Sequence, residues 1–520
     1  MNTKYFIPFA LLVLLAGAGC QKLSEDPKGN LTPSAFFKTQ SDLDASVAAI
    51  YTELTPDFAF GFTTRMTSCF SADDLTTDPG LNKGDMRAFD ELNGASTNAS
   101  LLNQWQGPWN AVYQANNVLN NYQTVVSTPT QIQQSIGQAY FLRAFSYYYL
   151  VRVFGPIPDI TTQIAVLDRP QRDSISKIYT TIISDLQTAI ADLPPSFPGA
   201  PGKATCGAAR ALLADVYLTM TGYPINQTSY YALAAAEADS VINEVADVPN
   251  GIAYSLVPDF AQVFTTNNNT ESIFGLQFNV AGGVPERSYG SSSVPLDESG
   301  LDGSGGWDDY YPEINFRLNS PNCYRSYCTY YDTIKLLQKN RTYTLVPWNS
   351  PLTHAGHPYY KKFRHGLVTN GVGDGVNENS DSIFSINPST NKSMDFIRYP
   401  MVLLDYAEAS TMAAGSPSSA AYAAINLVRQ RAGEPNLVGG LSAQAFQDSV
   451  VAERGWEFAG ENGVRWFDIV RLQMLPQIIA ARNPLENPIN TSNPLITRYL
   501  APIPISDMNN DPTWAQNPGY

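Results

Sequence analysis

Apolar side chains recur every three or four residues through most of this 520-residue chain. The first stripe lies on one face of a predicted helix and consists of Leu43, Val47, Ile50 and Leu54. Nine further stripes follow at 108–126, 131–154, 174–193, 204–221, 229–246, 398–413, 418–432, 442–459 and 464–481. Helices of this length joined by short turns favour antiparallel pairs. The pattern therefore predicts a mainly α fold, an irregular solenoid of tetratricopeptide-like helical pairs.

The region from 247 to 397 interrupts this periodicity. It is rich in Gly, Pro, Ser, Asn and aromatic residues, and its loosest stretches are 288–313 and 369–382. A short β-like run at 272–279 is expected to pair within the region. Long loops inside a compact protein usually carry function. We therefore predict a single domain over 34–520, in which helices at 34–246 and 398–520 form a scaffold and 247–397 is a partly β, ligand-facing excursion.

The amino terminus reads as an export signal. Residues 1–20, MNTKYFIPFALLVLLAGAGC, contain one lysine, an apolar run and small residues before Cys20. The run is shorter than the about 20 residues that a permanent transmembrane helix needs. We predict a lipoprotein signal peptide at 1–19, acylation at Cys20 and a polar tether at 20–33, although Gly17 stands where such signals usually have Leu. The alternative is an ordinary secreted protein in which Cys20 has no role.

The charge of the chain excludes one large class of partner. It has 47 acidic and 32 basic side chains, which gives a formal net charge of −15. Because no stripe of Lys and Arg offsets this charge, we expect no binding to nucleic acid. Charged residues make up 15% of the chain, and Asn, Gln, Ser, Thr and Tyr take their place. Such a surface suits neutral, hydroxyl-rich ligands.

Catalytic motifs are missing from the sequence. It contains neither a serine elbow nor a phosphate-cradling loop. The strongest candidate for acid and base chemistry is the carboxylate set Glu453, Glu457 and Glu461, spaced four residues apart, because a glycoside hydrolase needs two carboxyl groups that flank the bond. Interleaved arginines more often form ion pairs with such carboxylates, and they lower a carboxyl pKa, which is the wrong direction for a general acid. We therefore predict that the protein is not an enzyme.

Metal ligands and cysteines are few. Three histidines, His354, His357 and His365, share one loop without the cysteine pair or helical glutamate of a zinc site, so we predict free surface histidines and no metal. The acidic stretch 297–309 is a weak candidate for structural calcium, because it matches no fixed ligand spacing.

Export to an oxidising compartment permits disulfide bonds. Cys323 and Cys328 are close in sequence, and we predict that they form one. Cys69 and Cys206 have no basic neighbours that would activate a thiol, so we predict inert thiols at both positions.

Several stretches together resemble the SusD/RagB family of surface lipoproteins. They occur in the family's order and are LTPSAFF (31–37), GQAYFLRAFSYYYLVRVFGPIP (137–158), RYPMVLLDYAEA (398–409), INLVRQRAG (425–433), ERGWEFAGENGVRWFDIVR (453–471) and QNPGY (516–520). The resemblance implies a helical scaffold of four tetratricopeptide-like pairs and a less regular ligand-binding region. It also implies a non-catalytic protein, anchored to outer-membrane lipid at the cell surface through Cys20. Such proteins cover a SusC-like TonB-dependent outer-membrane β-barrel and deliver oligosaccharides or, in some members, peptides.

The charged residues within these motifs are expected to be structural. Arg143 should pair with a carboxylate, and Arg465, Asp468 and Arg471 should be satisfied charges beside the packed ring of Trp466.

A sugar site needs aromatic faces beside hydrogen-bonding side chains. Relatives of this kind draw their ligand surface from the early loops and from the excursion. Among the candidates we favour Trp307, because Gly and Asp flank it. The full set of predicted ligand residues is Trp307, Tyr310, Tyr311, Tyr324, Tyr327, Trp348, Asp73, Asp74, Arg87 and Trp105. The alternative ligand is an oligopeptide, for which backbone amides and an apolar cleft would replace stacked rings.

Overall fold

The computed structural model describes residues 33–162, 169–244, 254–298, 305–331, 333–339, 342–363, 390–489 and 498–520. The predicted signal peptide, Cys20, the tether up to residue 32, His365 and the stretch 369–382 lie outside these ranges.

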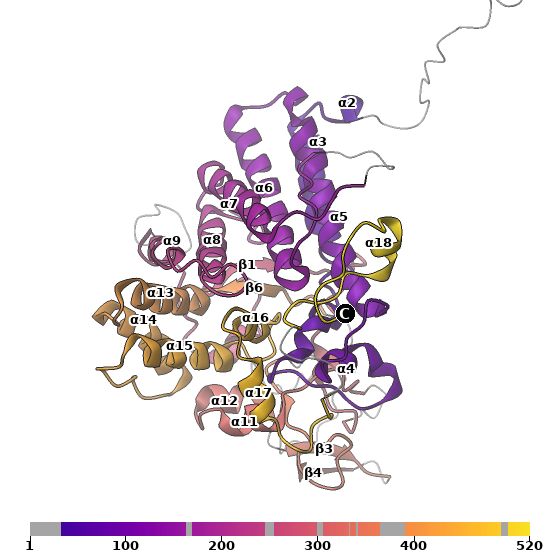
Figure 1. The fold of residues 1–520 in the computed structure, drawn as a ribbon, viewed down its shortest axis with the longest axis vertical. Coiled ribbons are helices and arrows are strands. Elements are labelled where there is room, and N and C mark those ends of the chain that lie inside the picture. The colour runs from indigo at the N-terminus through magenta and orange to yellow at the C-terminus, as the bar shows by residue number, and fades with distance from the viewer. Residues whose placement is uncertain are drawn as a thin grey trace, which may run out of the picture.

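The first group of helices forms the upper part of the molecule and its middle (Figure 1). Each helix from α5 to α9 packs against the one before it, and α3 packs against both α5 and α6. The bounds are α3 (Gln40–Glu53), α5 (Ala99–Asn121), α6 (Pro129–Phe154), α7 (Ile175–Asp192), α8 (Cys206–Met220) and α9 (Tyr230–Glu244). The predicted mainly α fold is confirmed.

A second group of helices continues this array from the other end of the sequence. It contains α13 (Tyr399–Ala414), α14 (Ser419–Ala432) and α15 (Ala443–Glu457). Helix α13 packs against α8 and α9 as well as against α14 and α15. The helical array is therefore continuous from α9 to α13, although the excursion separates these two helices in the sequence. Figure 1 shows α13 beside α9.

Local sequence explains several helix ends. Ser174 caps α7, because its hydroxyl accepts a hydrogen bond from the backbone N–H of Lys177. Thr128 caps α6 in the same way, and Pro129 occupies the first turn, where no N–H is needed. Helix α14 ends at Gly433, whose φ of 79° is left-handed and therefore suits glycine.

One predicted helix is broken in the structure. The stripe at 464–481 divides into α16 (Val464–Arg471) and α17 (Leu475–Ala481). Between them Gln473 has a φ of 53°, which no α-helix can contain. Periodicity alone did not reveal the break, because apolar residues continue at helical spacing on both sides of it.

The described part of the excursion contains three small antiparallel strand pairs. Strand β1 (Ser272–Leu276) pairs with β6 (Met394–Arg398) and joins the two ends of the region, which confirms a strand in the predicted β-like run. The other pairs are β2 (Tyr330–Tyr331) with β5 (Tyr359–Tyr360), and β3 (Thr333–Leu337) with β4 (Tyr343–Pro347). In the last pair Ile334 lies opposite Val346.

Short helices complete the described structure. They are α2 (Pro33–Phe36), η2 (Thr63–Ser71), η3 (Leu81–Lys83), α4 (Gly84–Asp90), η4 (Tyr122–Thr124), α10 (Phe260–Val263), η5 (Gly290–Ser293), α11 (Ile314–Asn319), α12 (Tyr324–Thr329) and α18 (Ile505–Asn510). None of the helices in the described ranges combines the length and apolar character needed to cross a bilayer.

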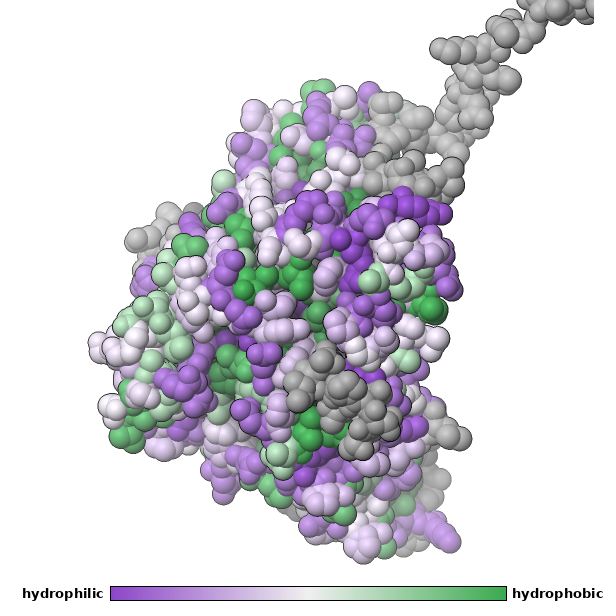
Figure 2. Space-filling view, viewed as in Figure 1, coloured by the Kyte–Doolittle hydropathy of each residue, from purple (hydrophilic) through white to green (hydrophobic). Residues whose placement is uncertain are grey.

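One hydrophobic core extends through both helical groups and most of the excursion. A smaller second core lies under β3 and β4 and consists of Tyr311, Tyr331, Ile334, Leu336, Val346 and Tyr359. Figure 2 shows hydrophilic residues over most of one face, with hydrophobic residues in small, separate areas.

Candidate functional site

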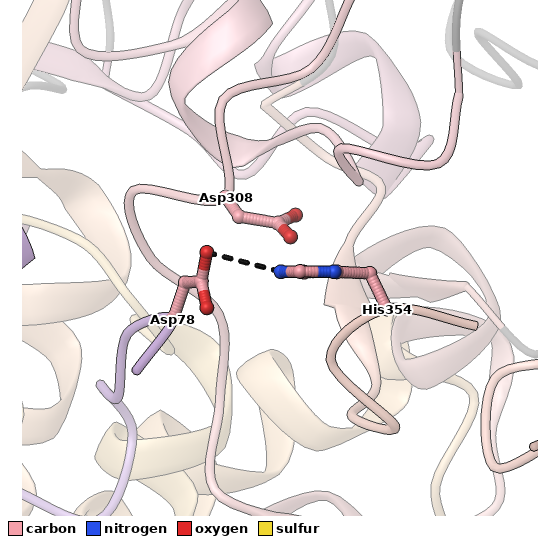
Figure 3. A group of neighbouring side chains, drawn as sticks. All are labelled: Asp78, Asp308 and His354. Atoms are coloured by element: carbon pink, nitrogen blue, oxygen red, sulfur yellow. Dashed lines mark hydrogen bonds and ion pairs between the residues drawn. The ribbon is translucent and has the colours of Figure 1, made fainter. Parts of the chain in front are cut away.

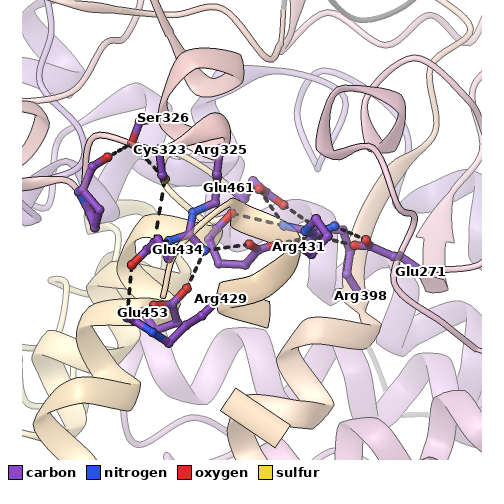
Figure 4. Close-up of polar contacts among 12 residues, drawn as sticks. Glu271, Cys323, Arg325, Ser326, Arg398, Arg429, Arg431, Glu434, Glu453 and Glu461 are labelled. Atoms are coloured by element: carbon purple, nitrogen blue, oxygen red, sulfur yellow. Dashed lines mark hydrogen bonds and ion pairs between the residues drawn. The ribbon is translucent and has the colours of Figure 1, made fainter. Parts of the chain in front are cut away.

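The carboxylates of α15 and the following turn form a buried ion-pair network (Figure 4). Arg325 Nη1 lies 2.6 Å from Glu453 Oε1 and 3.1 Å from Glu457 Oε2. Arg398 Nη1 lies 3.1 Å from Glu457 Oε1, and Arg398 Nε lies 2.9 Å from Glu461 Oε2. The network ties α12 and the start of α13 to α15.

Glu457, at the centre of this network, has the wrong electrostatics for acid catalysis. Burial by itself raises the pKa of Glu457, but the guanidinium groups of Arg431, Arg398 and Arg325 outweigh burial and lower that pKa to about 2. A general acid in a glycoside hydrolase needs a raised pKa. The predicted ion pairing of these glutamates is therefore confirmed.

The other motif charges are also paired. Arg143 Nη2 lies 2.7 Å from Asp185 Oδ1, and Arg471 Nη1 lies 2.6 Å from Glu408 Oε1. Arg465 Nε lies 2.7 Å from Asp73 Oδ1. Asp73, a predicted ligand residue, therefore forms an ion pair within the protein. These groups fix the packing of the helices.

Trp307 belongs to a partly exposed group of aromatic and charged side chains. Its ring packs edge-to-face with Phe62 at a centroid distance of 6.4 Å. The guanidinium carbon of Arg287 lies 5.5 Å from the centroid of the Phe62 ring and 5.7 Å from that of Trp307. Arg287 also forms an ion pair with Asp57. We refer to Asp57, Phe62, Arg287 and Trp307 as the Trp307 cluster.

Backbone hydrogen bonds position this cluster. The N–H of Arg287 donates to the carbonyl of Gly61 at 2.9 Å, and the N–H of Trp307 donates to the carbonyl of Ser291 at 2.8 Å. A Cβ at Gly61 would lie 2.1 Å from the carbonyl oxygen of Thr55, so only glycine permits this approach. Residues 57–62 are thereby held beside the segment that contains Arg287.

The Trp307 cluster offers the chemistry that a sugar needs. An indole and a phenyl ring present apolar faces, while Arg287 donates hydrogen bonds and Asp57 accepts them. Both charged side chains reach solvent, with 35% of Arg287 and 47% of Asp57 exposed. Three of the four members, Asp57, Phe62 and Arg287, were not among the predicted residues. The aromatic run DFAFGF at 57–62 was the signal available for Phe62, and nothing local distinguishes Arg287.

Four predicted ligand residues are instead buried, and for these the structure corrects the sequence analysis. Tyr310 and Tyr311 are 0% and 1% exposed, because Phe363 and Tyr359 pack against their rings. Asp74 accepts a hydrogen bond from the N–H of Gly460 beneath the surface. Trp105 is 4% exposed and packs edge-to-face on Phe154. None of these four has enough surface to act as a platform for a ligand.

The remaining predicted residues lie on other elements. Tyr324 and Tyr327 are 43% and 55% exposed on α12, with Tyr324 donating to Asp259 Oδ1 at 2.6 Å. Trp348 packs on the second core. Arg87 donates to the carbonyl of Gly80 at 2.7 Å. The structure therefore distributes the predicted set over several places and does not bring it into one site.

The predicted disulfide between Cys323 and Cys328 is wrong, because both thiols are free. Cys323 immediately precedes α12, and Cys328 lies in that helix. Cys323 has the extended backbone angles of an N-cap residue, whereas Cys328 lies five residues further on, inside the helix. Cys323 Sγ lies 3.8 Å from Glu434 Oε1, whereas Cys328 is buried.

Two histidines are described, and their environments differ. His354 is exposed, as predicted, and pairs with Asp78. His357 is buried, contrary to prediction, and its Nε2 lies 2.8 Å from Glu486 Oε2. Burial lowers the pKa of His357, but Glu486 outweighs burial and raises the pKa overall.

Three cavities in the described ranges lie away from the Trp307 cluster. One of about 630 Å³ is lined by polar and apolar side chains of α11, α15 and α17, among them Trp456, and by the Asp73–Arg465 pair. Another of about 550 Å³ lies between Trp109, Arg169 and Trp514. A third, of about 440 Å³, includes Tyr51, Gln138 and Lys203.

Comparison with known proteins gives consistent matches. A sequence model described as the SusD family matches residues 270–520, and one described as "Starch-binding associating with outer membrane" matches 36–218. SusD-like protein P2 of Formosa agariphila is 29% identical, over 99% of this chain and 100% of its own. A SusD homolog of Bacteroides thetaiotaomicron has a TM-score of 0.76 at 20% identity, covering 94% of this chain and 98% of its own. A laminarin-binding SusD-like protein has a TM-score of 0.70 at 22% identity, covering 93% and 100%.

Proposed function

The chain belongs to the SusD family, and on that premise we propose that it is a non-catalytic, cell-surface protein that captures an oligosaccharide or polysaccharide. One of the matching family descriptions names starch and the outer membrane, and one structural relative is named for laminarin. Both names support a glycan as the class of ligand.

The Trp307 cluster is the observation that carries this proposal. A sugar ring would lie against the indole of Trp307, where its C–H face makes apolar contact. Its hydroxyl groups would accept from Arg287 and donate to Asp57. The ion pair between these two side chains holds both near the rings before a ligand arrives, which reduces the ordering cost of binding.

The proposal includes an anchor and a partner. Acylation at Cys20 would hold the protein on outer-membrane lipid, with residues 20–33 as a tether. A SusC-like TonB-dependent outer-membrane β-barrel would receive the glycan. Membership of the family is the support for both parts of the proposal.

An oligopeptide is the second candidate ligand, and the cavity of about 630 Å³ favours it. Asn315, Gln444 and Gln477 line this cavity beside Trp456, and their amides match the hydrogen-bonding groups of a peptide backbone.

Affinity electrophoresis tests the choice between these ligands. The protein starting at Gln21 is run through gels that contain starch, laminarin or other polysaccharides, with Trp307→Ala and Tyr113→Ala in parallel. Tyr113 is 60% exposed on α5 and lies outside the Trp307 cluster, so its variant controls for loss of a surface ring. We expect one polysaccharide to retard the wild type and Tyr113→Ala, and to retard Trp307→Ala much less. Retardation by no polysaccharide, with binding to a peptide library, would favour the second candidate. Release of shortened sugars would contradict the non-catalytic assignment.

A further inference from the structure

Three side chains from separate segments converge near the Trp307 cluster (Figure 3). Asp78 lies between η2 and η3, Asp308 follows Trp307, and His354 lies between β4 and β5. One possible ligand atom from each residue lies within 4.8 Å of the other two. His354 Nε2 and Asp78 Oδ2 are 3.2 Å apart. Asp78 and Asp308 are buried, whereas 46% of the His354 side chain is exposed, so the group opens to solvent through the imidazole.

Asp308 has a carboxylate oxygen that the fold leaves without a partner. The residue is 0% exposed. Its Oδ1 accepts from the backbone N–H of Leu296 and from the hydroxyl of Tyr359, both at 2.7 Å. Its Oδ2 is buried and has no hydrogen-bond partner among the described residues. Figure 3 shows this carboxylate directed toward the imidazole edge that faces Asp78.

An oxygen in this position is costly without a cation. The carboxylate of Asp308 is fully buried, and a carboxylate oxygen of Asp78 lies within 4.8 Å of it. The ion pair between His354 and Asp78 accounts for those two side chains but leaves Asp308 Oδ2 without a partner. A bound cation would satisfy that oxygen and offset the repulsion between the two carboxylates.

We propose that Asp78, Asp308 and His354 bind a divalent transition-metal ion, with Zn²⁺ as the preferred ion. An imidazole nitrogen suits Zn²⁺, whereas Ca²⁺ and Mg²⁺ prefer ligand sets made of oxygen. Two ligands of a tetrahedral ion at about 2.0 Å are about 3.3 Å apart, close to the separation of His354 Nε2 and Asp78 Oδ2. Three protein ligands leave the fourth position to water.

The ion would add a link between three segments, two of which already meet in an antiparallel bridge between Thr76 and Tyr311. Because Asp308 is bonded to Trp307, coordination would also restrain the loop that carries the indole. Asp297 Oδ2 accepts from the backbone N–H of His354 at 2.6 Å and positions the histidine loop from a fourth segment. Metal binding itself does not depend on the proposed glycan function, and its test is independent of any sugar.

Isothermal titration with zinc chloride tests the site on protein that has been treated with a chelator and dialysed. The wild type is compared with His354→Ala, Asp308→Asn and Asp448→Asn. Asp448 is an exposed carboxylate on α15 and controls for loss of one negative charge. We expect one Zn²⁺ per chain in the wild type and in Asp448→Asn, and an affinity at least about tenfold weaker in the other two variants. Zinc should also raise the melting temperature of the wild type but not that of His354→Ala.

Equal zinc affinity in all four proteins, or no binding in the wild type, would overturn the proposal. Binding of Ca²⁺ in preference to Zn²⁺ would overturn the role of His354. If Asp308→Asn fails to fold, His354→Ala still decides, because 46% of the His354 side chain is exposed and its removal leaves the core intact. Anomalous diffraction at the zinc absorption edge would then locate the ion, and a peak away from His354 would also refute the site.

Discussion

Replacing Glu457 by glutamine tests whether the α15 carboxylates stabilise the fold. Glu457 Oε1 lies 2.5 Å from Arg431 Nη2 and 3.1 Å from Arg398 Nη1, and Oε2 lies 3.1 Å from Arg325 Nη1. Glu457→Gln keeps the size of the side chain but removes the charge that three buried guanidinium groups share. Removal of one partner from a buried ion pair destabilises a protein by about 3–5 kcal/mol.

The pKa of Glu457 leads to a similar magnitude. It falls from 4.5 to about 2 on folding, which corresponds to about 3 kcal/mol of stability at neutral pH. Because the folded-state pKa is the lower one, this stability is present above about pH 4.5 and is lost as the pH falls toward 2. The difference between wild type and Glu457→Gln should therefore be largest at neutral pH and shrink in acid.

Urea denaturation at pH 7, 5 and 3.5 measures this difference. Glu237→Gln is the matched control, because Glu237 pairs with Arg210 at 3.0 Å where both side chains are about a quarter exposed. We expect the control to lose less than about 1 kcal/mol. If Glu457→Gln lost no more than Glu237→Gln at pH 7, or if its deficit grew in acid, the structural role assigned to the network would be wrong.

Three further predictions concern the ligand surface, a buried carboxyl and the thiols. Arg287→Ala should weaken glycan affinity at least about tenfold by titration calorimetry, since a charged hydrogen-bond donor is lost, and should leave the urea midpoint unchanged. Burial raises the pKa of Asp74 from 3.8 to about 7, so wild-type stability should fall as the pH rises through this range. Asp74→Asn should therefore have the higher urea midpoint at pH 8, with no advantage below pH 4. Titration of the protein starting at Gln21, in denaturant and without a reductant, should give four free thiols. A count of two would indicate that Cys323 and Cys328 do form a disulfide bond.

The helical scaffold could be predicted because its signals are local. An apolar stripe and a capping side chain lie within a few residues of each other, and Ser174 before α7 is such a case. The break between α16 and α17 could not, because it depends on the backbone conformation of Gln473 and not on the apolar pattern.

The candidate site was less accessible to sequence reasoning. Trp307, Tyr310 and Tyr311 lie in one short polar stretch and share the same local signals, yet two of them are buried. The difference comes from Tyr359 and Phe363, about 50 residues further along the chain, which pack against the tyrosines. Phe62 lies outside the excursion, early in the chain, and only the fold brings it into contact with Trp307.

The disulfide prediction failed for a geometric reason. Proximity in sequence favoured a bond between Cys323 and Cys328, but in the fold the sulfur of Cys323 lies beside Glu434 and Cys328 is buried within α12. Likewise, no sequence pattern indicates that His354 lies beside Asp78, because 276 residues separate them. The predicted absence of a metal site rested only on the spacing of ligands that are close in sequence.

A crystal structure with the oligosaccharide identified by electrophoresis tests glycan capture at the Trp307 cluster most directly. We predict a sugar ring stacked within about 4 Å of the Trp307 indole, with hydroxyl groups hydrogen-bonded to Arg287 and Asp57. Sugar density in the cavity beside Trp456, with the indole of Trp307 left bare, would contradict the assignment.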